Sequence, residues 1–302
     1  QRLSFHQPTQ LYVVPRSIPI ATIIFIFTIN EYIVHFLSRL FSKISIMSQE
    51  LRKYEKDTPQ YYFYKKMHET QTLEYVKMMR KKYSVLNNKK MTIHKALSLL
   101  DSFIDPSDPD VDVPNSIHAY QTAERIRKKY PDDKELQITG LIHDLGKVLF
   151  SFGEDSISVV GDTYVLGCEF PDSIVYYDTM KNNPDYGEYE KNGIYKKACG
   201  LDNLYLSYGH DEYLYEVLRQ NKSHLLTQKY LNIIRYHSFY PWHTGGDYHQ
   251  FMNENDKKIL KDVLMFNEFD LYSKEDDTKI TQEVKGYYFS LLNEYFHDEL
   301  HW

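Results

Sequence analysis

Residues 134–150 read KELQITGLIHDLGKVLF. Apolar residues recur here at intervals of three and four, which is the period of an amphipathic α-helix, and a polar face repeats with the same period. The apolar face consists of Ile138, Leu141, Ile142, Leu145 and Leu149, and the polar face of Gly140, His143, Asp144 and Lys147. The stretch therefore predicts one helix that carries an imidazole, a carboxylate and an ammonium on one surface, to be covered by a partner or by water.

The His-Asp dipeptide by itself is weak evidence for a site. The chain contains three such dipeptides, His143-Asp144, His210-Asp211 and His297-Asp298. His, Asp and Lys are also common on the solvated face of a helix. A functional interpretation of His143-Asp144 therefore depends on the other candidate residues.

His118 has a local context that favours a helix. It follows the sequence Pro114-Asn115-Ser116, in which Asn115 or Ser116 is expected to cap the first turn of a helix that runs towards Lys128. His210, within LSYGHDEYLYEVLRQ, has the weaker local argument.

His237 and Asp270 each extend an apolar stripe rather than a polar face. His237 follows Tyr230, Ile233 and Ile234 at helical spacing, and Asp270 follows Ile259, Val263 and Phe266 in the same way. A carboxylate on an apolar stripe is costly to bury unless it is paired or binds a metal.

The candidate ligands form one ordered set: His118, His143, Asp144, His210, His237 and Asp270. One histidine alone is best interpreted as a hydrogen-bonded core residue, but the whole set exceeds the needs of one metal ion. Four imidazoles with two carboxylates suit iron, manganese or zinc, because calcium and magnesium prefer shells of oxygen alone. The residue types do not choose among these three metals.

Composition limits the remaining classes. The chain has 302 residues, 42% of them hydrophobic, and a formal net charge of −6 with its basic residues dispersed. We therefore expect one catalytic domain and no nucleic-acid partner. Two cysteines, Cys168 and Cys199, are too few for a disulfide framework and indicate a cytoplasmic protein with free thiols.

The first 46 residues differ from the rest. They are rich in Ile, Phe and Val, and their apolar run, 18–29, is shorter than the roughly 20 residues of a bilayer span. The first methionine is Met47, where the polar sequence MSQELRKYEKD begins. We therefore expect 1–46 to be an N-terminal extension outside the working fold, 47–302 to be the catalytic domain, and no association with a membrane.

Helical patterns dominate from Met47 onward, which predicts an all-α fold. We expect helices over 58–79 and 92–103, followed by the loop DPSDPDVDVPNS. Strand signals are few, and the stretch 158–167 (SVVGDTYVLG) is expected to form a short extended pair around Gly161-Asp162.

Several ordered segments carry a resemblance to a known family. They are DPDVDVPNSIHAYQTAERIRKKYPD, GLIHDLGKVL, VVGDTYVLGC, CGLDNLYLSYGHDEYLY, IRYHSFYPWHTGGDY and FNEFDLYSK, with a terminal Leu-x-Trp. Over about residues 50–302 the chain resembles the myo-inositol oxygenase family, a helical branch of the His-Asp (HD) domain superfamily. The resemblance implies an oxidoreductase of inositol catabolism that uses O2 to open the ring of myo-inositol, giving D-glucuronate and water.

The resemblance also implies a role for each ligand. His118, His143 and Asp270 would hold one iron ion, His210 and His237 would hold a second, and Asp144 would bridge the two, with the active centre in a mixed Fe(II)/Fe(III) state. Lys147 would place an ammonium beside the bound hydroxyls, where it stabilises an alkoxide oxygen or passes a proton.

Specificity for a cyclic polyol depends on matched donors and acceptors, because the substrate offers almost no apolar surface. The residues that align with the family's substrate contacts are Arg52, Asp105, Asp108, Lys147, Gly161, Asp162 and Ser238. Taken alone, Asp105 and Asp108 would be interpreted as turn residues in an Asp-Pro-rich loop. The segment after Arg52 is shorter than is typical of the family, and His243 is expected to be structural.

Three other classes remain as alternatives. Most HD-domain proteins are metal-dependent phosphohydrolases, but a phosphate site should present several lysines or arginines, whereas the candidate pocket residues here are mainly Asp, Ser and one Lys. A related di-iron oxygenase with another substrate is the second alternative, and a catalytically silent helical binding protein is the third.

Overall fold

The computed structural model describes residues 56–107, 114–272 and 279–302, all within one unit of the chain, Leu51–Trp302. Helices make up most of these residues and each strand has two residues, so the predicted all-α fold is confirmed. The predicted extension, 1–46, lies outside the described residues, and its boundary at Met47 stays a prediction. In the described part of the chain, no helix is both long and apolar enough to cross a membrane.

The elements follow one another as short helices. The α-helices are α2 (Pro59–Thr70), α3 (Leu73–Lys82), α4 (Ile93–Leu99), α5 (Asn115–Lys129), α6 (Lys134–Ile142), α7 (His210–Gln220), α8 (Gln228–Tyr236), α9 (Tyr240–His243), α10 (Asp256–Tyr272) and α11 (Gln282–Tyr295). The 3₁₀ helices are η1 (Leu100–Ser102), η2 (Leu145–Phe152), η3 (Ser156–Ser158), η4 (Tyr177–Asn182), η5 (Leu201–Asn203) and η6 (His249–Phe251). The strands are β1 (Lys90–Met91), β2 (Val165–Leu166), β3 (Tyr205–Leu206) and β4 (Leu300–His301).

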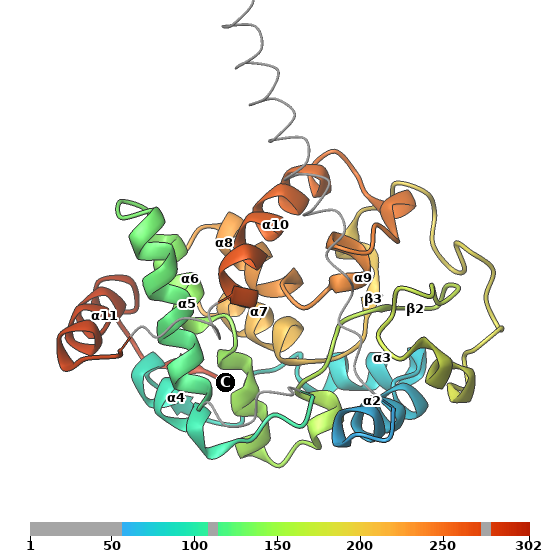
Figure 1. Cartoon of the computed structure of the whole chain (residues 1–302), viewed down its shortest axis with the longest axis horizontal. Helices are drawn as coiled ribbons and strands as arrows, with labels where there is room; N and C mark the ends of the chain where they lie inside the picture. Colours follow the sequence, from blue (N-terminus) through green and yellow to red (C-terminus); the bar gives the residue numbers. More distant parts are fainter. Residues whose placement is uncertain (1–55, 108–113, 273–278) are drawn as a thin grey trace, which may run out of the picture. The chain divides into compact units, whose positions relative to one another are not determined.

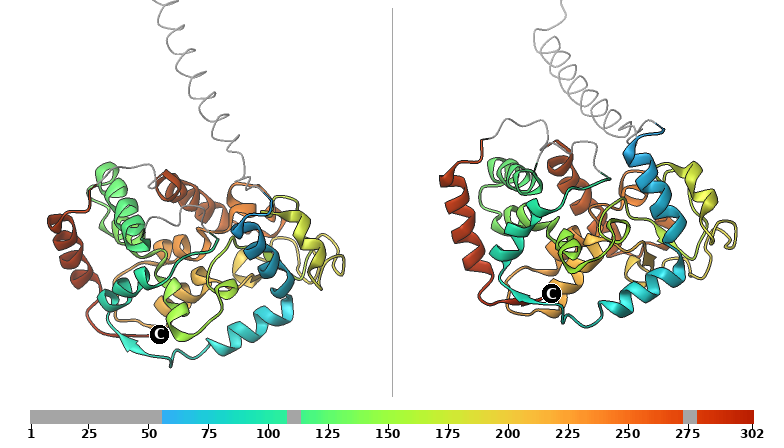
Figure 2. Two further views of the ribbon diagram at one scale, coloured as in Figure 1. Left: turned by 60° about the horizontal axis from the view of Figure 1, so that its bottom comes forward. Right: turned by 90° about the horizontal axis from the view of Figure 1, so that it is seen from below.

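Five helices form the centre of the fold. α5 packs on α6, α7 packs on α8, and α10 contacts α5, α6 and α8. The views agree that α11 lies on one side of this group and that α2 and α3 lie on the opposite side (Figures 1 and 2). The group therefore has inward-facing surfaces from several helices that are far apart in the sequence.

The stretch 134–150 is not the single helix that its period predicts. α6 ends at Ile142, and after Asp144 the chain continues as the 3₁₀ helix η2. The break accompanies a close approach, since a Cβ on Gly146 would lie 2.1 Å from the backbone oxygen of His210. In a 3₁₀ helix, residues i and i+3 are eclipsed. Asp144 and Lys147 are thereby aligned, and their side chains meet.

The predicted helix over 58–79 is also divided. α2 ends at Thr70, and Thr72 caps α3 by accepting a hydrogen bond from the backbone of Tyr75. Between the two helices, Gln71 is fully buried and its amide bonds to the backbone of Ile157 and Tyr208. This buried side chain holds the break in place, which helical period alone could not reveal.

The predicted pairing of the extended segment near Gly161 is wrong. The stretch 158–167 does not fold back on itself. Instead β2 pairs antiparallel with β3, so that Val165 lies opposite Leu206. The predicted helix over 92–103 is confirmed as α4 followed by η1.

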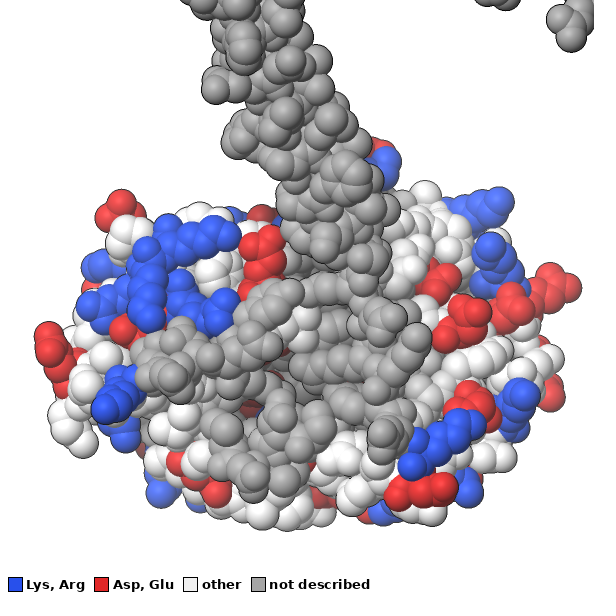
Figure 3. Space-filling model, viewed as in Figure 1, with Lys and Arg blue, Asp and Glu red and all other residues white. Residues whose placement is uncertain are grey.

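The start of α5 also differs from its prediction. Its first turn has no side-chain cap, and Pro114 occupies the capping position. The amide of Asn115 donates to the carbonyls of Leu100 and Phe103, and Ser116 donates to Asp101. Both side chains thus fasten α5 to the preceding segment. At its other end α5 is basic, and Figure 3 shows Lys and Arg gathered there, a distribution that suits the negative end of the helix dipole.

The C-terminus closes the core. Trp302 is fully buried and its indole NH donates to the carbonyl of Met91, 3.1 Å away. β4 pairs with β1, which places His301 opposite Lys90. The terminal Leu-x-Trp noted in the sequence is therefore part of the core.

Candidate metal centre and substrate pocket

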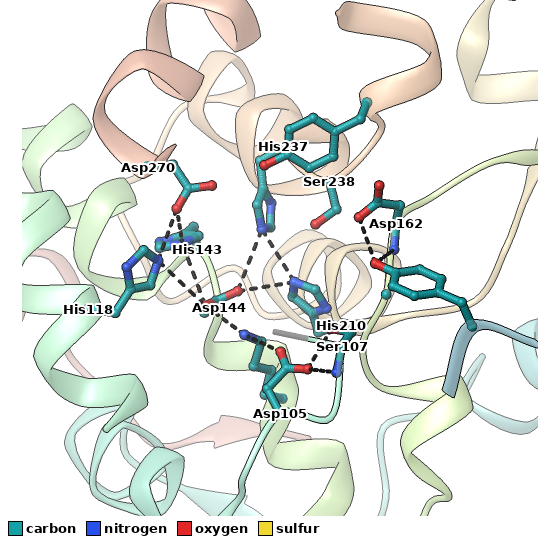
Figure 4. A pocket seen from close by; sticks show the side chains of 14 residues that line it. Asp105, Ser107, His118, His143, Asp144, Asp162, His210, His237, Ser238 and Asp270 are labelled. Atoms are coloured by element: carbon teal, nitrogen blue, oxygen red, sulfur yellow. Dashed lines mark hydrogen bonds and ion pairs between the residues drawn. The ribbon is translucent and has the colours of Figure 1, made fainter. Parts of the chain in front are cut away.

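The six predicted ligands come together in one pocket (Figure 4). Each comes from the end of a helix or from the residues next to it. His118 lies in the first turn of α5, His143 and Asp144 follow α6, His210 begins α7, His237 follows α8, and Asp270 lies in the last turn of α10. The central helices converge at these ends, and this convergence brings the six side chains together.

One group of ligands surrounds Asp270. Its Oδ1 lies 3.0 Å from Nε2 of His118 and 3.3 Å from Nε2 of His143. These three residues lie close enough together to share one metal ion. The two histidines also face Oδ2 of Asp144, which is 3.7 Å from Nε2 of His143 and 4.0 Å from Nε2 of His118.

A second group lies on the other side of Asp144. Its Oδ1 is 3.1 Å from Nε2 of His210 and 3.7 Å from Nε2 of His237. The two Nε2 atoms are 3.3 Å apart. Asp144 therefore directs one carboxylate oxygen towards each pair of histidines, which is the arrangement of a bridging ligand.

Backbone carbonyls orient three of the four imidazoles. The Nδ1 of His143 is 2.8 Å from the carbonyl of Gly140, that of His210 is 2.8 Å from the carbonyl of Val159, and that of His237 is 2.8 Å from the carbonyl of Ile234. A carbonyl only accepts, so each Nδ1 carries the proton, and in the neutral ring Nε2 presents a lone pair. Lone pairs that face carboxylate oxygens in a buried site are suited to binding a cation between them.

The charges of the buried residues also favour a cation. Burial alone raises the pKa of Asp144, but Lys147 and His143 outweigh it and hold that pKa well below its usual range. Burial likewise raises the pKa of Asp270, and His143 and His118 outweigh it. Both side chains are therefore carboxylates. In the same way, burial lowers the pKa of His210, and Asp211 and Asp144 outweigh it and raise it to about 10.

Lys147 is the ammonium of the pocket. Its Nζ lies 2.9 Å from Oδ2 of Asp144 and 2.9 Å from Oδ2 of Asp105, and its side chain is 8% exposed. Burial lowers the pKa of Lys147, but the two carboxylates outweigh it and hold that pKa above its usual value. Lys147 is therefore charged while it is almost completely buried.

The predicted substrate contacts that the structure describes lie in the same pocket. Asp105, Lys147, Gly161, Asp162 and Ser238 all line it. Arg52 and Asp108 lie outside the described residues, so their roles stay predictions. The pocket is lined by four carboxylates, among them Asp105 and Asp162, and by one ammonium. Its lining therefore offers mainly hydrogen-bond acceptors.

Three other residues of the lining were not predicted: Tyr64, Ser107 and Tyr240. Tyr64 donates to Oδ1 of Asp162, 2.9 Å away, and accepts from the backbone NH of the same residue at 3.2 Å. Ser107 donates to Asp105 through its backbone NH at 2.9 Å. Tyr64 and Asp162 are 98 residues apart, so no local pattern could have indicated their contact. The contact of Ser107 is local, because an aspartate that accepts from the backbone two residues on is common in Asp-Pro-rich turns.

Asp211 was missed although a signal was present. Together with Leu214 and Leu218 it follows helical spacing, so it lies on an apolar stripe, which is the argument that singled out Asp270. It is 3% exposed and its Oδ1 lies 2.8 Å from Nε2 of His210. It also belongs to a third group of possible ligands, with His210 and His237.

His243 has the structural environment expected of it. It is buried, and its Nε2 is 3.0 Å from the carbonyl of His237. Burial lowers the pKa of His243 to about 4, so the ring is neutral and Nε2 donates. This contact helps to fix the backbone that carries His237.

The helical fold and this donor set define a class of protein, the helical metalloenzymes whose metal ligands are histidine and aspartate. Comparisons with known proteins identify the family within that class. Residues 58–302 match the model of the myo-inositol oxygenase family. Over 246 residues the chain is 48% identical to inositol oxygenase 1 of Arabidopsis thaliana, covering 80% of this chain and 79% of that protein. It is 45% identical to the inositol oxygenases of Mus musculus and Homo sapiens over 243 residues, covering 79% of this chain and 85% of each relative. The chain belongs to the myo-inositol oxygenase family, as its motifs predict.

Proposed function

We propose that this protein oxidises myo-inositol at a centre of two iron ions bridged by Asp144. His118, His143 and Asp270 would hold one ion, and His210 and His237 the other. The observation that carries this assignment is the position of the Asp144 carboxylate, whose Oδ2 faces the two histidines of the first group and whose Oδ1 faces those of the second. A single metal ion would leave one of these groups without a cation.

The ligand chemistry supports iron. Four imidazoles with two carboxylates form a nitrogen and oxygen donor set that suits iron, manganese or zinc. Where a metal centre oxidises an alcohol with O2, the metal must change its oxidation state, which zinc does not. When bound, a mixed Fe(II)/Fe(III) pair supplies the redox and Lewis-acid chemistry of the reaction. Iron is also the metal that the resemblance of the motifs to this family implies.

The residues of the pocket have distinct roles towards a polyol. Each hydroxyl of the substrate is a donor that needs an acceptor, and the carboxylates of Asp105 and Asp162 are acceptors in the lining. Gly161 and Ser238 lie beside them, and we assign all four to substrate binding. Arg52 and Asp108 are further proposed contacts.

Lys147 and Asp144 are the proposed catalytic residues. The ammonium of Lys147 is held in position by Asp105 and Asp144, so it lies between the substrate lining and the bridging ligand. From there it can stabilise a substrate oxygen that loses its proton, and it can pass a proton. Because Lys147 is nearly buried, water does not screen its charge.

The overall reaction is a four-electron oxidation. One myo-inositol and one O2 give one D-glucuronate and one water, with cleavage of a carbon–carbon bond of the ring. The reaction balances without a separate reductant. We further propose that the enzyme acts in the cytoplasm, because both cysteines, Cys168 and Cys199, are free thiols.

The phosphohydrolase alternative has less support. A phosphate site needs several cationic side chains, and in the described lining Lys147 is the single lysine or arginine. Its ammonium is already paired with two carboxylates. Such a lining favours hydroxyl groups over a phosphate ester.

Oxygen uptake by the iron-loaded protein tests the reaction, with mass spectrometry of the product. Appearance of one glucuronate for each O2 consumed is expected. No uptake by a folded protein with two irons would reject the oxygenase assignment, and phosphate esters would be tested next.

Iron content of variants tests the ligand assignment. Asp270→Asn should retain about one iron ion and Asp144→Ala should lose most of both, with both proteins folded by circular dichroism. Asp155→Asn is the matched control, because this carboxylate is half exposed and pairs with Lys66 at the surface. If Asp144→Ala binds two irons and keeps full turnover, the bridging role is wrong.

A further inference from the structure

Asp211 is a buried carboxylate that the assignment above leaves without a role. It is 3% exposed, and it follows His210 in the first turn of α7. Charged side chains are rarely buried this deeply without partners. Its partners therefore indicate what it does.

Two hydroxyl groups donate to this carboxylate from different segments of the chain. Oδ1 accepts from the hydroxyl of Ser238 at 3.1 Å, and Oδ2 accepts from the hydroxyl of Thr163 at 3.0 Å. Ser238 follows the ligand His237, and Thr163 follows the proposed substrate contact Asp162. The backbone NH of Thr163 also donates to the carbonyl of Ser238 at 2.9 Å, so the two segments are joined twice.

These bonds determine what Ser238 offers to a ligand. A serine hydroxyl has one proton and two lone pairs. Because its proton is directed to Asp211, Ser238 presents lone pairs to the pocket, in which it is a lining residue. A hydroxyl of a bound polyol would then be the donor and Ser238 the acceptor.

We propose that Asp211 is a positioning residue for the substrate, an inference that rests on the proposed function. It fixes the hydroxyl of Ser238 as an acceptor and holds Thr163, and with it the neighbouring Gly161-Asp162 segment, next to Ser238. It is thereby a determinant of polyol specificity, although it acts through its neighbours. This role differs from metal binding, which its distances of 2.8 Å to Nε2 of His210 and 3.4 Å to Nε2 of His237 would also permit. Both oxygens of the carboxylate accept from these hydroxyls, Oδ1 from Ser238 and Oδ2 from Thr163, as the positioning role requires.

The test is a double-mutant cycle between Asp211→Ala and Ser238→Ala, measured as binding of myo-inositol to the full-length, iron-loaded protein by calorimetry. Each single change is expected to weaken binding about tenfold. In the Asp211→Ala background, Ser238→Ala should add less than about twofold, because the serine has already lost its orientation. Additive losses would overturn the proposal.

Two further readouts separate positioning from other roles. Asp211→Ala should keep two irons per chain, and loss of one iron would show that Asp211 is a ligand and overturn the positioning role. Asp211→Asn should recover most of the binding, since its amide oxygen can still accept from Ser238 while its NH2 donates to Thr163. If the role of Asp211 were purely structural, Asp211→Asn would not recover binding and its melting temperature would be lowered.

Ser158→Ala is the matched control. Ser158 is a fully buried serine that bonds to Tyr75 outside the pocket lining, so its loss should leave binding unchanged. If the unaltered protein binds myo-inositol without oxidising it, the proposed function fails while the cycle still tests Asp211. If it does not bind myo-inositol at all, both proposals fail.

Discussion

Replacement of Lys147 by methionine tests the electrostatics of the site. The change keeps most of the side chain's apolar stem and removes an ammonium that lies 2.9 Å from both Asp105 and Asp144. Both partner carboxylates are 9% exposed or less, so water cannot replace the lost ammonium. Breaking a buried ion pair from one side costs about 3–5 kcal/mol.

The loss of stability caused by Lys147→Met should depend on whether iron is bound. In the metal-free protein, Lys147→Met removes the cation that pairs with buried Asp105 and one of the cations beside buried Asp144, and the free energy of unfolding should fall by about 3–5 kcal/mol. In the iron-loaded protein the metal ions compensate Asp144, so only Asp105 loses its partner. The loss should then be smaller, about 1–3 kcal/mol. The turnover number should fall by about 10²–10⁴, because the group that stabilises or moves a proton is gone.

Urea unfolding of both forms, followed by circular dichroism, measures the stability change, and oxygen uptake measures turnover. Lys66→Met is the matched control. Lys66 pairs with Asp155 at 2.7 Å, but the two side chains are 59% and 50% exposed. Loss of a surface pair changes stability by about 0–1 kcal/mol. If metal-free Lys147→Met is as stable as the Lys66→Met control, the ammonium does not compensate the buried carboxylates and the reasoning is refuted.

Three further predictions follow from other parts of the site and core. Burial lowers the pKa of His210, but the surrounding carboxylates outweigh it and raise it to about 10, so iron must displace a proton from this ring at pH 7. Calorimetric loading in buffers of different ionisation enthalpy should therefore show proton release, and its absence would contradict the prediction. Burial lowers the pKa of His68 to about 3, below the unfolded value of roughly 6.5, so the unfolded state binds an extra proton as pH falls. Between pH 6.5 and 4.5 the free energy of unfolding of the unaltered protein should therefore fall by about 2 kcal/mol more than that of His68→Gln. Equal pH dependence of the two proteins would refute this prediction. Tyr64→Phe removes the hydroxyl that donates to Asp162 and should raise KM about two- to tenfold, whereas Tyr62→Phe, at an exposed tyrosine, should not; equal KM values would reject the role of Tyr64.

The sequence predicted the convergence of the ligands for sound physical reasons. His237 and Asp270 lie on apolar stripes, and a polar side chain on such a stripe must point into the protein. Both are indeed directed into the pocket from α8 and α10. The same reasoning applied to α7 would have found Asp211, which shares a stripe with Leu214. The sequence analysis considered Asp211 only as part of the dipeptide His210-Asp211, and the apolar stripe on which Asp211 lies was therefore missed.

Other features depend on contacts between distant segments, which no local pattern contains. The break between α2 and α3 rests on Gln71, whose amide bonds to Ile157 and Tyr208. The partner of β2 is β3, about 40 residues further along the chain. Tyr64 bonds to Asp162, which lies 98 residues further along the chain. Such pairings are decided when the whole core packs, so periodicity cannot predict them.

The helix end within the stretch 134–150, which the sequence did not predict, explains how two of the ligands are oriented. His143 and His237 each follow directly after the last residue of an α-helix. There the final carbonyls of the helix have no NH partner within it. Each ring donates its Nδ1 proton to the carbonyl three residues earlier, Gly140 or Ile234, at the same distance of 2.8 Å. His143 thus directs Nε2 at the centre from the end of α6, and the 3₁₀ helix that follows brings Lys147 beside Asp144.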